Sequence, residues 1–240
     1  MKKILWIVVA RSGSKAIPGK NIKLLGGVPL MAYRIKSALS SKYSNDIWIS
    51  SDSEDYAKIA EEYGAKKMFI RPAELADDNA SSSDVLLHAM NFALSIKQSY
   101  ELIGLLEPTS PFVTTLELDL AIDQLDASDD ATAIVAIKES RPNTIFIQEE
   151  SLYLEILSKN IESMKIQGRQ AFKKEITPSG GFYISKWDTF LKSKTFYTNK
   201  TLGFELKGVS TLEIDEPDDW QFADYIVKNK LFKNTNNYDI

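Results

Sequence analysis

The stretch ILWIVVARSGSKAIPGKN, residues 4–21, contains the two features that decide the fold. Its first six residues are continuously apolar and mostly branched, which is typical of a parallel strand buried on both faces. The residues that follow are polar and basic and include Gly13 and Gly19. Ligands of open parallel sheets bind at the carboxyl ends of the strands. We therefore predict that the loop at 10–21 lies at a binding site.

Apolar runs and helical periods alternate along the first part of the chain. Short apolar runs recur, and segments with helical periodicity lie between them. The predicted strands span residues 4–9, 46–51, 67–70, 102–106 and 131–137, and the predicted helices span 29–39, 54–63, 82–96 and 115–125. Strands and helices that alternate at this spacing form βαβ units, so we predict an α/β fold with a mostly parallel sheet.

The pattern changes after Pro142. Residues 144–147 and 152–157 are predicted to pair as a β-hairpin, within an excursion from the core that spans 143–180. A two-stranded arm cannot bury its own apolar side chains. We therefore expect this arm to mediate formation of a homodimer, and light scattering on the active protein would test that expectation.

The chain is predicted to form one domain. A length of 240 residues suits a single large α/β unit. Two further strands at 182–184 and 212–214 and a closing helix at 218–227 complete the predicted domain, which spans 1–230. Residues 231–240 are predicted to be a polar tail.

The composition excludes several kinds of site and partner. There is no cysteine and one histidine, His88, which excludes disulfides, thiolate zinc sites, cysteine nucleophiles and metal sites of several histidines. The net charge of −4 argues against binding to nucleic acid or to a membrane surface through a polybasic patch. The apolar run at 4–10 meets Arg11 without a signal-peptide cleavage site, so we expect a cytoplasmic protein.

The loop after the first strand has the composition of a phosphate-binding segment. Arg11, Lys15 and Lys20 supply positive charge, and glycines let a backbone approach a phosphate closely. The loop lacks the G-x-G-x-x-G dinucleotide fingerprint, and five residues rather than the four of a Walker A loop separate Gly13 from Gly19. We predict a phosphate site of another kind; the alternative is a solvated basic loop.

Five segments occur in an order and spacing that resemble those of one enzyme family. They are ARSGSKAIPGKN (10–21), Ser51-Asp52, RPAELADDNASS (71–82), LLEPTSPF (105–112) and LEIDEPDD (212–219). Together they resemble the acylneuraminate cytidylyltransferases, also called CMP-N-acylneuraminate (CMP-sialic acid) synthetases. The resemblance implies a three-layer Rossmann-like nucleotidyltransferase fold with a dimerisation arm that contains a β-hairpin. It also implies that CTP and a nonulosonic (sialic-type) acid react to give pyrophosphate and a CMP-sugar for cell-surface polysaccharide.

The resemblance also assigns residues to the substrates. It implies that the nucleotide contacts Arg11, Ser12, Gly13, Ser14, Lys15, Lys20, Arg71, Ala80 and Ser82. It implies that the sugar contacts Asn21, Glu107, Thr109, Ser110 and Arg169, with Arg169 close to the sugar site of the second subunit. Catalytic roles fall to Arg11, Lys20 and Asp215, and the ligands of Mg²⁺ would be Asp215 and Glu213.

Some positions depart from the family pattern. Glu213 stands where relatives usually have Asp; on an extended strand it and Asp215 would point the same way, and the pair would hold one metal where relatives hold two. Glu107 stands in place of a Gln and Thr177 in place of an Arg, both on the sugar side. No such departure falls on the CTP side, so the nucleotide is better defined than the sugar. A carboxylate at Glu107 favours a sugar face rich in hydrogen-bond donors.

Other interpretations of the same residues stay open. The rival enzymes are a CTP-dependent synthetase for an octulosonate-type acid and a glycosyltransferase that binds a finished nucleotide-sugar, and a third rival is a nucleotide sensor without catalysis. Ser82 and Asp52 have alternative roles as helix caps, and Glu213 and Asp215 as the polar face of an edge strand. His88 is expected to be structural rather than catalytic.

Overall fold

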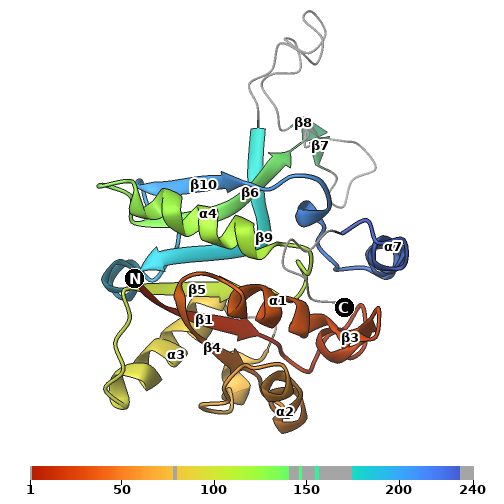
Figure 1. Cartoon of the computed structure of the whole chain (residues 1–240), viewed down its shortest axis with the longest axis horizontal. Coiled ribbons are helices and arrows are strands. Elements are labelled where there is room, and N and C mark those ends of the chain that lie inside the picture. Colours follow the sequence, from red (N-terminus) through yellow and green to blue (C-terminus); the bar gives the residue numbers. More distant parts are fainter. Residues whose placement is uncertain (1, 78–79, 141–145, 148–154, 157–174, 233–240) are drawn as a thin grey trace, which may run out of the picture.

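The computed structural model describes residues 2–77, 80–140, 146–147, 155–156 and 175–232. Within them, one six-stranded sheet lies between two layers of helices (Figure 1). The order across the sheet is β10-β6-β9-β5-β1-β4. The strands span Lys3–Val9 (β1), Ser44–Ser50 (β4), Leu102–Leu106 (β5), Ala133–Ser140 (β6), Glu175–Lys186 (β9) and Thr201–Glu205 (β10).

Helices cover both faces of the sheet. Buried side chains of α1, α2 and α4 pack on one face, and those of α3 and α6 pack on the other. The α-helices span Leu30–Leu39 (α1), Glu54–Glu62 (α2), Ser82–Ser95 (α3), Thr115–Asp126 (α4), Trp187–Ser193 (α6) and Pro217–Lys228 (α7). The shorter elements are η1 (Lys20–Ile22), β2 (Leu24–Leu25), β3 (Val28–Pro29), η2 (Ala73–Leu75), β7 (Phe146–Ile147), β8 (Glu155–Ile156) and η4 (Gly208–Thr211).

The sheet is mixed, with one strand opposed to the others. β1 pairs in parallel with β4 and β5, and β10 pairs in parallel with β6. β9 lies between β5 and β6 and is antiparallel to both. The predicted α/β fold with a mostly parallel sheet is confirmed. Because β9 runs in the opposite direction, its first half, including Gly180, meets the edge where β5 and β6 end.

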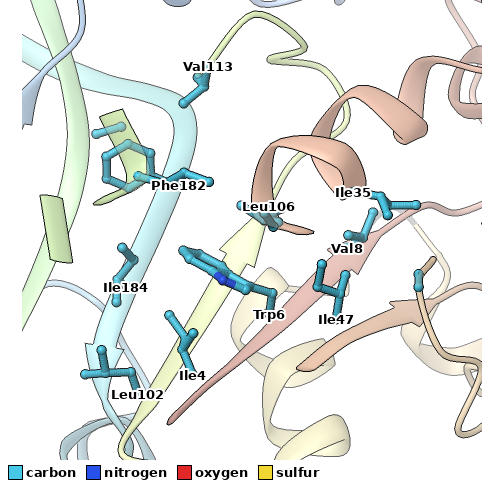
Figure 2. Close-up of a cluster of buried hydrophobic side chains, with 14 of the residues drawn as sticks. Ile4, Trp6, Val8, Ile35, Ile47, Leu102, Leu106, Val113, Phe182 and Ile184 are labelled. Atoms are coloured by element: carbon cyan, nitrogen blue, oxygen red, sulfur yellow. The ribbon is translucent and has the colours of Figure 1, made fainter. Parts of the chain in front are cut away.

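The central strand β1 explains the continuous apolar run of the sequence. Ile4, Trp6 and Val8 face the side of α1, α2 and α4 (Figure 2). Leu5 and Ile7 face α3 and α6. All five side chains are fully buried. A strand with helices on both faces has no solvent side, so apolar and polar residues do not alternate along it.

The closest packing in this core involves Trp6 and Gly104 on β5. The two residues are register partners, and a Cβ at position 104 would lie 2.2 Å from the Trp6 ring. That distance is far inside van der Waals contact, so only glycine fits beside the indole.

A third cluster of buried residues anchors the segment after η4. Ile214 packs with Ile17 from the first loop and with Ala223 and Ile226 from α7. The Ile214 backbone N–H also donates to the Thr109 carbonyl, with an N–O distance of 2.8 Å. These contacts hold the neighbouring Asp215 beside the loop that follows β5.

Several predicted elements differ from the structure. The strand predicted at 67–70 is wrong, because only one bridge pair, Trp48 with Lys66, forms before the chain turns. The strand predicted at 212–214 is wrong as well, because the segment follows a 3-10 turn and makes a single hydrogen bond to the Thr109 loop. α6 and β10 were not predicted.

The predicted arm at 143–180 is described only in part. β7 and β8 pair antiparallel, which agrees with the predicted hairpin, and β9 begins at Glu175. The other arm residues, including Arg169, lie outside the described residues, so the dimer stays a prediction. In the described part of the chain, no helix has the length and apolar character needed to cross a membrane.

Candidate active site

A cavity of about 450 Å³ opens at the carboxyl ends of β1 and β5. The sequence predicted a site at these strand ends, and most of the predicted residues line the cavity. They are Arg11, Ser14, Lys15, Lys20, Asn21, Arg71, Ala80, Ser82, Glu107, Thr109 and Asp215. Ser12, Gly13, Ser110 and Glu213 are not among the lining residues, and Arg169 lies outside the described residues.

The basic loop is held in place by side chains at its two ends. Asp52 accepts hydrogen bonds from the Ser12 N–H at 2.8 Å and from the Ser12 hydroxyl at 2.7 Å. The buried Asn21 amide donates to the Arg11 carbonyl at 3.0 Å. Burial raises the pKa of Asp52, but the Ser12 hydrogen bonds outweigh that effect and hold it below its ordinary value. Asp52 is therefore a charged clamp on the loop, and the alternative of a helix cap is wrong, since Ser53 caps α2.

Lys20 and Asp215 form an ion pair at the edge of the cavity. The Lys20 ammonium donates to the Ile214 carbonyl at 2.8 Å and to Asp215 Oδ1 at 3.1 Å. The Lys20 side chain is 13% exposed, whereas that of Asp215 is 65% exposed. Lys20 is thus fixed in position, and Asp215 retains an open side toward solvent and the cavity.

A second group of residues in the cavity lining comes from the segment that leads into α3. Arg71 is buried, and its guanidinium donates to the Ser50 hydroxyl at 3.0 Å and to the Ser50 carbonyl. Burial lowers the pKa of Arg71 to about 10, so it keeps its charge at neutral pH. The Ala80 N–H donates to Asp77 at 2.8 Å. The alternative of Ser82 as helix cap is wrong, because the N-cap of α3 is Ser81, whose hydroxyl accepts from the Asp84 N–H.

His88 has no part in the cavity lining. Its ring lies edge-on to Phe69 with a centroid distance of 4.7 Å. Its Nδ1 is buried without a hydrogen-bond partner among the described residues, and burial lowers its pKa. These contacts agree with the predicted structural role.

Glu107 connects the cavity to a second hollow of about 200 Å³. Glu107 and Ser82 line both spaces, and the second is otherwise formed largely by Tyr183, Phe196 and Tyr197. These three aromatic residues were not predicted from the sequence to line a site. Their signal was weak, because aromatic residues in a strand or beside a helix are more often part of a core.

Four charged side chains act on the Glu107 carboxylate. Burial is the main reason that its pKa rises to about 7, and the negative charges of Glu213 and Asp215 raise it further. The charges of Arg34 and Lys20 act in the opposite direction. At neutral pH, Glu107 is therefore poised between its neutral and charged forms.

Arg34 supports this end of the site from beneath, and sequence analysis missed it. The fully buried guanidinium donates to the Val113 carbonyl at 2.9 Å and to the Gly181 carbonyl at 2.8 Å. It thereby joins α1 to the loop before α4 and to β9. Next to Gly181, a Cβ on Gly180 (φ 62°) would lie 2.7 Å from a Glu213 oxygen and 2.9 Å from a Glu107 oxygen. Only glycine allows both carboxylates to pack there.

Glu213 has a different environment from Asp215. Its Oε1 accepts from the Lys138 ammonium of β6 at 2.5 Å. The expectation that Glu213 and Asp215 point the same way on a strand is wrong, because the segment is not a strand and the two carboxylates have different cationic partners.

The donor set of the cavity fits a divalent cation that arrives with a phosphate ligand. Among the described residues, no group of three or more acidic, histidine or cysteine side chains forms a metal cage. Mg²⁺ commonly binds through one or two carboxylates, substrate phosphates and water. The exposed carboxylate of Asp215, at the rim of a basic cavity, meets that requirement.

The raised pKa of Glu107 predicts that stability falls as pH rises. Below about pH 4.5 the carboxyl is protonated in both folded and unfolded chains, so it contributes no difference. Between its ordinary pKa of 4.5 and the folded value of about 7, the unfolded chain releases the proton first. Stability is lost across this window, and Glu107→Gln should remove the loss. Without nucleotide or metal, the variant should gain up to about 3 kcal/mol over the parent between pH 5 and pH 8.

Urea unfolding at several pH values measures this gain. The exposed Glu62→Gln variant on α2 is the control for loss of one negative charge. Stability curves of parent and Glu107→Gln that stay parallel from pH 5 to pH 8 would contradict the prediction.

Comparison with known proteins agrees with this geometry. Residues 5–232 match the family model described as "Cytidylyltransferase". The chain is 32% identical over 241 residues to an N-acylneuraminate cytidylyltransferase of Escherichia coli, covering 98% of this chain and 56% of that protein. It is 30% identical over 228 residues to a pseudaminic acid cytidylyltransferase of Campylobacter jejuni, covering 94% and 97%. The chain thus spans about half the length of the N-acylneuraminate relatives it matches.

A solved structure has the same fold. It is the CMP:2-keto-3-deoxy-manno-octonic acid synthetase complexed with CTP, with a TM-score of 0.68, 14% identity, and coverage of 95% of this chain and 99% of that one. The matching family, the relatives and the fold lead to one conclusion: this chain belongs to the cytidylyltransferase family, among the acylneuraminate cytidylyltransferases and related enzymes.

Proposed function

We propose that the chain transfers CMP from CTP to a hydroxyl of a nonulosonic acid and releases pyrophosphate. One observation carries the proposal: a basic cavity with the Lys20–Asp215 pair at its rim continues, past Glu107, into a smaller aromatic hollow. The basic cavity suits a nucleoside triphosphate, and the aromatic hollow suits a sugar. The names of two relatives, at 32% and 30% identity, combine a nonulosonic acid with cytidylyl transfer, which supports this assignment.

The basic loop would bind the triphosphate. Arg11, Lys15 and Lys20 bring three positive charges to the cavity lining, and Ser14 adds a hydroxyl donor. Ser12 and Gly13 lie behind the lining, where Ser12 fixes the loop through Asp52. Such fixed charges stabilise a transferring phosphoryl group because they need no reorientation during the reaction.

Asp215 would hold Mg²⁺ against the phosphates. When bound, Mg²⁺ would supply positive charge at the α-phosphate and help to orient the attacking hydroxyl. The oxygen of that hydroxyl forms a bond to the α-phosphorus while the bond to the bridging oxygen breaks. The bridging oxygen leaves with pyrophosphate, and the hydroxyl proton passes to solvent. Lys20, held by two hydrogen bonds at the cavity rim, is placed to neutralise charge on the departing group.

The sugar would enter the aromatic hollow. The rings of Tyr183, Phe196 and Tyr197 offer apolar faces, and Glu107 offers hydrogen-bond acceptors between the two spaces. Thr109 and Asn21 line the larger cavity, where they would contact the sugar as it meets the nucleotide. Ser110 acts indirectly, because its hydroxyl lies 3.5 Å from the Ser179 carbonyl and links the β5 loop to β9. A sugar with amide or hydroxyl donors toward Glu107 is favoured over one with an anion there.

A pyrophosphate-release assay tests the function and the choice of nucleotide. Each of CTP, UTP, ATP and GTP is supplied with Mg²⁺ and a panel of keto-acid sugars that includes sialic, legionaminic, pseudaminic and octulosonic acids. We expect CTP to be preferred, by about 10⁴-fold if the Arg71–Ala80 end of the cavity reads the base through hydrogen bonds.

The outcomes of this assay separate the rival functions. Turnover of ATP at the same rate as CTP would contradict the proposed base recognition. Tight CTP binding without turnover by any sugar would indicate a nucleotide sensor. Turnover only with octulosonic acid would retain the reaction and replace the sugar class.

A further inference from the structure

Lys138 and Glu213 form an ion pair beside the active-site cavity. The two side chains lie 2.5 Å apart, on β6 and on the segment after η4, and are 31% and 27% exposed. One Glu213 oxygen accepts from the ammonium, and the other packs against Gly180. One oxygen of this carboxylate is therefore paired with the ammonium, and the other lies close to the backbone of Gly180.

Asp215 is the opposite case. Its side chain is more than twice as exposed as that of Glu213, and it lines the cavity where Glu213 does not. Its Oδ1 accepts from Lys20 at 3.1 Å. Among the described residues, no hydrogen bond or ion pair is formed by its Oδ2, so that oxygen can bind a cation. Only one of the two carboxylates is thus available to a cation that enters with the nucleotide.

A divalent cation at Glu213 would have to displace Lys138 or lie next to it. Two like charges in a half-buried space repel strongly, because water screens them poorly. The ammonium also has a local purpose without any metal, since Glu107 and Glu213 place two carboxylate oxygens around the same point above Gly180. Lys138 neutralises the Glu213 member of this pair.

We propose that Lys138 removes Glu213 from the metal site, so that this chain binds one divalent cation, at Asp215. The inference rests on the proposed function for the role of that cation in CTP binding. Lys138 then supplies, from within the protein, the positive charge that neutralises Glu213. Lys138 positions Glu213 directly, and it thereby affects Glu107, whose carboxylate lies beside that of Glu213 at Gly180.

Binding of Mn²⁺, followed by electron paramagnetic resonance, tests the proposal without relying on activity. In the presence of the non-hydrolysable analogue α,β-methylene-CTP, the parent protein should bind one Mn²⁺ per chain. Asp215→Asn should weaken that site by about tenfold or more, and Glu213→Gln should change its affinity less than about twofold. Lys138→Met should add a second Mn²⁺, and the double variant with Glu213→Gln should lose it again.

A matched control and a titration without nucleotide complete the experiment. Lys200 forms an ion pair with Asp130 at 3.3 Å, away from the cavity, so Lys200→Met should leave Mn²⁺ binding unchanged. Without nucleotide, Lys138→Met should still bind Mn²⁺ more tightly than the parent by about fivefold, because Glu213 then has no cationic partner and the neighbouring Glu107 adds negative charge. Circular dichroism verifies that each variant is folded.

Two results would overturn the inference. One is binding of two Mn²⁺ per chain by the parent, with loss of one in Glu213→Gln. The other is unchanged Mn²⁺ binding in a folded Lys138→Met variant, with and without nucleotide. Failure of the analogue to bind at all would instead count against the proposed function, and the titration without nucleotide would still decide the role of Lys138.

Discussion

Asp215→Asn should abolish most of the chemistry while the fold and much of the CTP affinity remain. Asn keeps the size of the side chain and one oxygen for Lys20, but it lacks the negative charge that holds a hard divalent cation. The α-phosphate then loses a counter-charge in the transition state. We expect kcat to fall by about 10²-fold or more, the scale seen when one preorganised electrostatic group is removed. CTP affinity should fall less, because the basic loop is intact.

Steady-state kinetics and CTP binding measured on the same preparation test this result. Asp218→Asn is the matched control, since Asp218 is an exposed carboxylate in the first turn of α7 and does not line the cavity. It should retain kcat within about twofold. Near-normal turnover of Asp215→Asn with Mg²⁺ would show that the metal binds elsewhere.

Lys20→Ala should depress kcat far more than it weakens CTP binding. The ammonium is fixed by hydrogen bonds to the Ile214 carbonyl and to Asp215, so it would lose little side-chain entropy on binding the phosphates. If it neutralises charge that develops on pyrophosphate, its contribution is largest in the transition state. We expect a loss in kcat of about 10²-fold, with a smaller rise in the Kd for CTP.

Lys23→Ala is the control for a nearby positive charge. Lys23 is exposed and lies over the Trp220 ring at 4.4 Å, outside the cavity. Its removal should leave both kcat and Kd close to the parent values. If Lys20→Ala weakens CTP binding and leaves kcat unchanged, then Lys20 stabilises the bound substrate and not the transition state.

The parts of the fold that were predictable are those in which a local pattern and the tertiary environment agree. Residues 4–9 of β1 and 102–106 of β5 carry no polar side chain because both faces of the sheet are covered, and α3 has a clear helical period. Residues 67–70 and 212–214 carry the same apolar signal without forming strands. In neither segment does the backbone form a continuous ladder. Lys66 bonds to β4 just before 67–70, and the Ile214 N–H bonds to Thr109.

The elements that were not predicted, β10 and α6, lack a local pattern and depend on tertiary contacts. β10 contains Gly203 and ends at Glu205, and α6 has seven residues, so neither offers a long apolar period. β10 forms because it pairs with β6 at the edge of the sheet, a long-range contact that no local pattern reports.

Some residues of the site could also be predicted from the sequence, and others could not. The loop from Arg11 to Asn21 and the 71–82 segment carry recognisable chemistry, and the structure brings them to one cavity. The buried Arg34 and the partner of Glu213 could not be predicted, because each depends on contacts between segments distant in sequence. Arg34 reaches β9 across the sheet, and Lys138 lies 75 positions before Glu213.

Phosphorus NMR of a reaction with CTP and the best acceptor sugar tests the central claim most directly. The proposed function predicts that the three CTP resonances disappear together. One resonance of a CMP-sugar phosphodiester and one of pyrophosphate should replace them in equal molar amounts, and Asp215→Asn should give neither on the same time scale. Formation of inorganic phosphate and CDP, or pyrophosphate without a new phosphodiester, would contradict transfer of CMP to the sugar.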